Sequence, residues 1–138
     1  MVNQGIVISK ISHIENNLQP LKKKQKITLE ELKKNSDLQD VILHNLQLSI
    51  QGCIDLASHI ISDEGWMVPD TLAGLFDVLS KHKIIPEELN DRLKKMVGFR
   101  NIIIHEYGTI DLNKVHSILT QDMQDIYSYL KLICVYAK

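Results

Sequence analysis

One arginine in this sequence stands where the helical pattern predicts an apolar side chain. Steps of four and three residues place one set on a single helix face: Leu89, Leu93, Met96, Arg100, Ile103 and Tyr107. A buried guanidinium is costly unless it is paired, and its planar fork suits a phosphate or a carboxylate. Arg100 therefore indicates either an anion-binding cleft or an internal ion pair, for which Asp55 is a candidate partner.

His105 follows five residues later and can donate or accept a proton near neutral pH. At about 100° per residue, Arg100 and His105 point roughly 140° apart on a continuous helix. One helix therefore does not bring both onto one substrate: either it unwinds near Ile104 or two copies of the chain meet. A structural role for His105 stays open, because imidazole suits the negative end of a helix dipole.

A row of polar side chains is expected on another helix, beside an apolar stripe. Its members recur at three- and four-residue steps: His44, Gln47, Gln51, Asp55 and Ser58. Such a row either lines a cleft or forms an ordinary solvent-facing surface.

Helices are the elements that must position these residues, because no segment alternates apolar and polar residues with a period of two. We expect helices at residues 4–24, 28–34, 36–63, 70 or 71–81, 86–106 and 111–136. Pro20 should kink or end the first helix near Asn17, and Ser36 should open a capping box on the long helix. Short connections favour antiparallel neighbours. The sequence predicts an all-α, four- to five-helix up-and-down bundle, with residues 1–138 as a single domain.

The composition of the chain argues against several classes of function. The chain has 138 residues, 44% of them hydrophobic, and a net charge of −1, which argues against a broad nucleic-acid-binding surface but leaves room for one small cleft. No long apolar run or signal peptide is evident, so we expect no membrane span and a cytoplasmic location. Cys53 and Cys134 lie in apolar periodic segments and are expected to be buried, reduced thiols. No residues have metal-ligand spacing, so no metal or cofactor is expected.

Arg100, His105 and Tyr107 read as Arg-x4-His-x-Tyr, which resembles the signature of HEPN-domain ribonucleases, and of HepT toxins in particular. Other segments resemble HepT proteins in the same order: residues 45–50, 65–66, 68–71 and 97–101. The similarity covers nearly the whole chain, and residues 2–34 are its least distinctive part. Gln51 departs from the pattern, because many relatives carry an acidic residue there.

The resemblance implies a HEPN-like homodimer with its active site at the dimer interface. It implies the toxin of a type VII toxin–antitoxin system, a metal-independent endoribonuclease that uses attack by the RNA 2′-hydroxyl. Arg100 and His105 would be catalytic and Asn101 supporting. An MntA-like nucleotidyltransferase antitoxin would be the partner and would transfer AMP to Tyr107. The possible cleft lining is His44, Gln47, Gln51 and Asp55.

Two other functions fit the same residues. The chain could be a non-catalytic HEPN subunit that binds nucleotide or substrate for a nucleotidyltransferase, with Arg100 gripping a triphosphate. It could also be a structural helical adaptor with Arg100 in an internal ion pair, in which case losing Arg100 would cost roughly 3–5 kcal/mol of stability. RNA cleavage by the purified protein distinguishes the first alternative from a nuclease.

Overall fold

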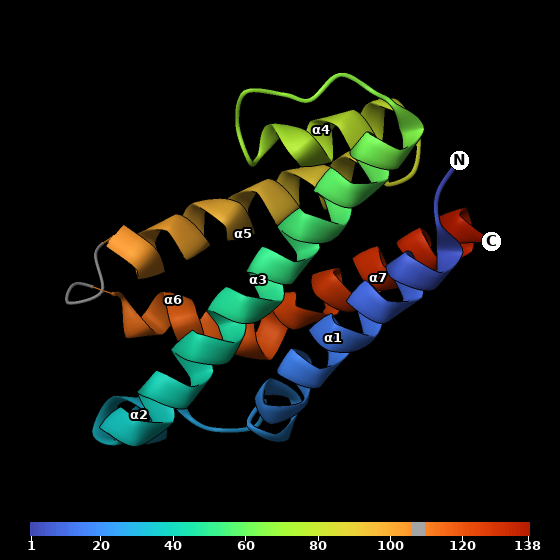
Figure 1. Ribbon diagram of the computed structural model, residues 1–138. Coiled ribbons are helices and arrows are strands. Elements are labelled where there is room, and N and C mark those ends of the chain that lie inside the picture. The colour runs from blue at the N-terminus through green and yellow to red at the C-terminus, as the bar shows by residue number, and fades with distance from the viewer. Residues whose placement is uncertain (106–109) are drawn as a thin grey trace.

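The structure, a computed structural model, describes residues 1–105 and 110–138, and helices form most of these residues (Figure 1). The elements are α1 (Gln4–Lys23), α2 (Leu29–Lys34), α3 (Ser36–Glu64), α4 (Gly74–Lys81), α5 (Glu87–His105), α6 (Leu112–Ser117), the π-helical turn η2 (Ile118–Asp122) and α7 (Met123–Ala137). No strand occurs within these residues. The predicted all-α class is confirmed, although short segments raise the number of helices above five.

α1 begins at Asn3, whose side chain accepts a hydrogen bond from the Ile6 backbone N–H. Apolar residues spaced three and four apart form its buried face: Val7, Ile11, Ile14, Leu18 and Leu21. Of the two alternatives predicted for Pro20, a kink or a helix end near Asn17, the helix end is wrong, because α1 continues to Lys23. The Asn16 carbonyl, which loses its donor to the proline, belongs to an exposed residue and can meet water.

Two short-range signals set the ends of α3. Its N-cap is Asn35, which accepts from the Leu38 N–H at 3.0 Å, so the predicted capping box at Ser36 is wrong by one residue. Gly65 ends the helix in the left-handed region at φ 71°, a conformation that glycine adopts without strain. α4 starts only at Gly74, where Thr71 Oγ1 accepts the Gly74 N–H at 3.0 Å.

α1 packs closely along α3 because one position of α3 has no side chain (Figure 1). A Cβ atom added at Gly52 would lie 2.5 Å from Ile14 Cγ1. The buried face of α3 continues into the core through residues such as Leu46, Ile50, Ile54, Ala57 and Ile61. The opposite side of α3 is left to the polar row described below.

The last expected helix is divided. Asp111 caps α6 by accepting from the Asn113 N–H at 2.9 Å, but the π-helical turn η2 separates α6 from α7. Tyr129 on α7 is fully buried and donates to the Cys53 carbonyl at 2.9 Å. Cys53 is buried as expected, whereas Cys134 is exposed, because it follows Ile133 on the outward side of α7.

No helix among the described residues is long and apolar enough to cross a membrane. The two chain ends lie at the same end of the bundle, where α1 and α7 run side by side (Figure 1). The end of α5 lies far from both termini in this view. The bundle therefore leaves the C-terminal half of α5 and the outer side of α3 as neighbouring surfaces.

Candidate active site

Arg100 is half-buried on α5 and points toward α3. Its Nη2 donates to Gln51 Oε1 on α3, and its Nη1 donates to Asn101 Oδ1 at 2.9 Å. Its Nε is buried and has no hydrogen-bond partner among the described residues. Both of these acceptors are neutral amides, so they orient the guanidinium without cancelling its charge.

Gln51 also donates from Nε2 to Asp55 Oδ1 at 2.9 Å. Asp55 is the carboxylate considered above as an ion-pair partner for Arg100. It contacts Gln51 instead, so Asp55 and Arg100 form no direct ion pair. The chain of side chains runs Asp55 to Gln51 to Arg100 to Asn101. Gln51 is the residue that joins α3 to α5 here.

The predicted polar row on α3 forms one surface beside Arg100. Gln47 and Gln51 are half-buried, while His44 and Asp55 are exposed. Sequence reasoning missed that apolar side chains belong to the same surface. Val41 and Leu48 are 40% and 37% exposed, and they fit the three- and four-residue steps of the row: Val41, His44, Leu48, Gln51 and Asp55. A mixed apolar and polar row of this kind suits contact with another protein surface.

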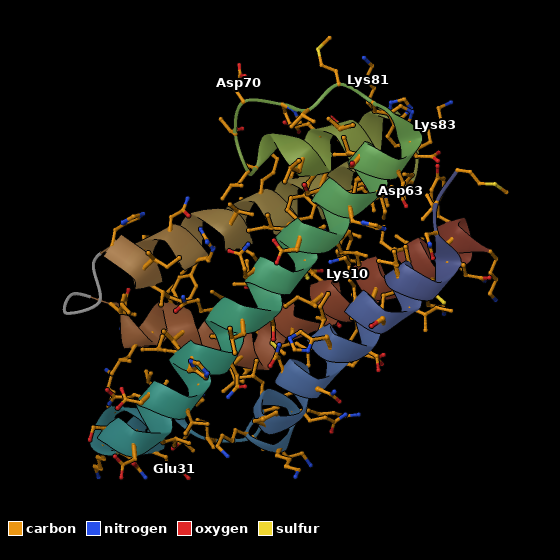
Figure 2. The ribbon with its side chains drawn as sticks, in the orientation of Figure 1. Lys10, Glu31, Asp63, Asp70, Lys81 and Lys83 are labelled. Atoms are coloured by element: carbon orange, nitrogen blue, oxygen red, sulfur yellow. The ribbon has the colours of Figure 1, made fainter. Side chains whose placement is uncertain are left out.

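The row borders a groove between α1 and α3 with a volume of about 270 Å³. Asp55 lines it from α3, while Ser9, Lys10 and His13 line it from α1. Figure 2 shows Lys10 on the side of α1 that faces α3. No spacing of residues predicted a functional role for α1, because the groove depends on how closely Gly52 lets the two helices approach.

His105 is exposed and is the last residue of α5. No hydrogen bond joins it to Arg100, in agreement with the opposite directions expected on one helix. Asn101 is also exposed. Tyr107, the predicted acceptor of AMP, lies outside the described residues. One copy of the chain thus presents Arg100 and His105 on different sides of one helix.

Within the described ranges, no three His, Cys, Asp or Glu side chains gather as a metal site would require. The arrangement offers an oriented cation, Arg100, and an accessible imidazole, His105, on different sides of the same helix. A guanidinium can stabilise negative charge that develops on a phosphorus centre. An imidazole can transfer protons near neutral pH.

Comparisons with known proteins find similar sequences and folds over nearly the whole chain. A family model described as Ribonuclease HepT-like matches residues 14–133. The chain is similar to a protein named mRNA nuclease HepT from Shewanella oneidensis, with 32% identity over 93% of this chain and 96% of the relative. It is also similar to a protein named tRNA nuclease HepT from Aphanizomenon flos-aquae, with 30% identity over 95% and 89%.

Among solved structures, the fold is similar to a tri-AMPylated HEPN toxin of Shewanella oneidensis in complex with an MNT antitoxin. The TM-score is 0.86 at 30% identity, covering 94% of this chain and 97% of the other.

Proposed function

Because this chain belongs to the ribonuclease HepT-like family, we propose that it is an RNA-cleaving toxin that works without a metal ion, with Arg100 and His105 as its catalytic residues. The observation that carries the proposal is the state of Arg100. Its guanidinium is half-buried and held by Gln51 and Asn101, yet no carboxylate among the described residues neutralises it. A cation held in this way is ready for a phosphodiester.

In the proposed reaction the 2′-oxygen of a ribose attacks the adjacent phosphorus. A bond forms between the 2′-oxygen and phosphorus, and the bond from phosphorus to the 5′-oxygen of the next nucleotide breaks. His105 takes the proton of the 2′-hydroxyl, and a second imidazole supplies a proton to the departing 5′-oxygen. Arg100 stabilises the extra negative charge at phosphorus. The product is a 2′,3′-cyclic phosphate or the 3′-phosphate formed by its hydrolysis.

A homodimer supplies the second imidazole in this proposal. Exposed apolar side chains interrupt the polar surface near Arg100: Val41 and Leu48 on α3, and Ile104, 38% exposed, on α5. Burying such side chains against a second copy removes them from water. It also places two copies of Arg100 and His105 around one cleft, with His44, Gln47, Gln51 and Asp55 as its lining. We take residues 1–138 to form the single domain of each subunit, which the match over residues 14–133 supports.

We propose RNA as the class of substrate and do not specify a particular kind of RNA. One relative is named for mRNA and another for tRNA. Attack by a 2′-hydroxyl requires only that ribose, so the chemistry is the same for either RNA and absent for DNA. A strand in which the 2′-hydroxyl at the cut site is replaced by hydrogen should therefore stay intact.

The direct test is RNA cleavage in the presence of EDTA by the wild type and by His105→Ala. We expect the wild type to cleave and the variant to lose roughly 10²- to 10⁴-fold in rate, as removal of a general acid–base does. His82→Ala is the matched control, because His82 is also exposed but stacks on Trp66 at the end of α4, away from Arg100. Equal cleavage by the wild type and His105→Ala would reject His105 as the catalyst. Intact RNA with the wild type would favour the nucleotide-binding subunit instead.

We further propose an MntA-like nucleotidyltransferase antitoxin as the partner, in the cytoplasm. The structural relative is AMPylated and in complex with such an antitoxin. Transfer of AMP to Tyr107 would add bulk and negative charge two residues after His105, where RNA phosphate must bind. Intact mass after co-expression with the antitoxin should rise by whole AMP units. Tyr107→Phe should gain none, and a variant that still gains AMP would remove Tyr107 as the only acceptor.

A further inference from the structure

A second cavity lies on the other side of α5 from the candidate active site. Arg100 bonds to α3, whereas Arg92 on the same helix bonds from Nε to Asp125 Oδ1 on α7 at 2.9 Å. Residues of α5, α6, η2 and α7 line a cavity of about 260 Å³. The proposed ribonuclease mechanism uses no residue of this cavity.

Some of the charged side chains that line the cavity are paired with an opposite charge, and others are not. Asp125 is 94% buried and is paired with Arg92. Asp122 is half-buried in the same wall, and no hydrogen bond or ion pair to it is seen among the described residues. Lys95 and Lys114 are exposed at the edges of the cavity. The cavity thus offers two unpaired ammonium groups for an anion and one unpaired carboxylate for a hydrogen-bond donor.

Two further observations indicate a built site. Asp122 is the last residue of the π-helical turn η2, and π-helical turns inside helices are rare and often occur at functional sites. Burial raises the pKa of Asp122, and the charge of Asp125 raises it further. A carboxyl whose pKa is raised by folding destabilises the folded state at neutral pH. A charged group that lowers the stability of the fold in this way is typical of a functional site.

The apolar lining limits the shape of the occupant. Met96 and Ile118 are both buried and contribute a thioether and a branched aliphatic side chain. A thioether contacts aromatic rings favourably. The volume is near the lower end of the range for ligand pockets, about 300 to 1,000 Å³, so the occupant is small.

We propose that this cavity binds a nucleoside monophosphate. Lys95 and Lys114 would bind the phosphate, Asp122 would accept hydrogen bonds from ribose hydroxyls, and the base would lie against Met96 and Ile118. The site is separate from the cleft at Arg100, and binding there does not depend on the proposed cleavage of RNA.

The test is a calorimetric titration of the purified protein with AMP, with inorganic phosphate and with adenosine, each in a separate experiment. AMP should bind about tenfold more tightly than either fragment, because it alone meets the ammonium groups and the carboxylate together. Lys114→Ala should weaken AMP binding by about tenfold. Lys131→Ala, an exposed lysine of α7 outside the cavity, should leave it unchanged.

Asp122→Asn separates a binding role from a structural one. The proposal predicts weaker binding of AMP and adenosine and no loss of phosphate binding. It also predicts a higher urea midpoint at neutral pH, because the desolvation of a buried charge and its repulsion from Asp125 are removed. A lower urea midpoint with unchanged AMP affinity would make Asp122 structural and overturn the proposal. AMP that binds equally to the wild type and Lys114→Ala would lie elsewhere, for instance at Arg100, and would also overturn it. Absence of AMP binding would do the same.

Discussion

Gln51 determines whether the positive charge of Arg100 stays available to bind a phosphate. An acidic residue there would form an ion pair with the guanidinium and compete with an RNA phosphate. The amide instead accepts from Arg100 and donates to Asp55, so it aligns the arginine and leaves its charge available. Neutral alignment of this kind costs less when substrate arrives, because no ion pair must be broken first.

Gln51→Leu should therefore lower both stability and activity. The change leaves the Arg100 Nη2 and the Asp55 carboxylate without this partner, and we expect a loss of about 1–2 kcal/mol in the free energy of unfolding. Urea unfolding measures this loss, with Gln47→Leu as the control, because Gln47 is also half-buried on α3 but has no side-chain hydrogen bond in the described part of the chain. Equal stability of the two variants would contradict the role given to Gln51.

A second residue-scale prediction concerns pH. The hydrogen bond from Asn90 lowers the pKa of Asp77 below its ordinary value of 3.8, and Lys94, 3.1 Å away, lowers it further. A carboxyl with a lowered folded pKa stabilises the fold above its unfolded value, and this contribution is lost as the pH falls.

The urea midpoint of the wild type should consequently fall more between about pH 6 and about pH 3 than that of Asp77→Asn. Asp91→Asn is the control, because Asp91 is an exposed carboxylate on the same helix as Asn90. It should show the full drop of the wild type. An Asp77→Asn protein with the same drop would show that this carboxyl does not contribute.

At the scale of the elements, local patterns predicted most helices, and long-range contacts account for what they missed. The buried stripe of α1, the ends of α3 and the cap at Asp111 follow from neighbouring residues. The continuation of α1 through Pro20 does not, because the buried Leu18 and Leu21 hold both sides of the proline in the core. No periodicity in the sequence predicts the turn η2 or the cavity beside it.

The candidate site divides in the same way. Arg100, His105 and the polar row were predicted from spacing and resemblance. The bond from Arg100 to Gln51 was not, because the two residues are 49 positions apart and meet only through the packing of α5 on α3. The α1 groove with Lys10 depends on the close approach at Gly52, which no spacing in the sequence reveals.

Two glycines in helices should respond oppositely to replacement by alanine. Alanine is favoured over glycine inside a helix by about 0.5–1 kcal/mol. At Gly52 the new Cβ would meet Ile14 Cγ1 at 2.5 Å, so α1 must shift and we expect a net loss of about 1–2 kcal/mol. A Cβ added at Gly98 would meet no atom within 4 Å beyond its chain neighbours and the backbone of its own helix, so Gly98→Ala should gain the full helix preference. Chemical unfolding of both variants checks the opposite signs, and a stabilised Gly52→Ala would contradict the packing argument.

For the whole molecule, the geometry of a single chain is incomplete for the proposed reaction. Arg100 turns inward toward α3, and His105 is exposed at the end of α5. One imidazole per chain must also serve as both base and acid unless a second copy contributes. The exposed Val41 and Leu48, seven residues apart on one side of α3, offer the surface for that second copy.

Leu48→Glu tests this requirement, because a buried, unpaired carboxylate disfavours association while an exposed one costs little. The variant should fold, sediment as a monomer and cleave RNA no faster than His105→Ala. Leu72→Glu is the matched control, since Leu72 is 42% exposed on the segment between α3 and α4, and it should remain dimeric and active. A monomeric Leu48→Glu protein that cleaves RNA at the wild-type rate would place a complete active site within one chain, and the imidazole of the second copy would then have no part in the reaction.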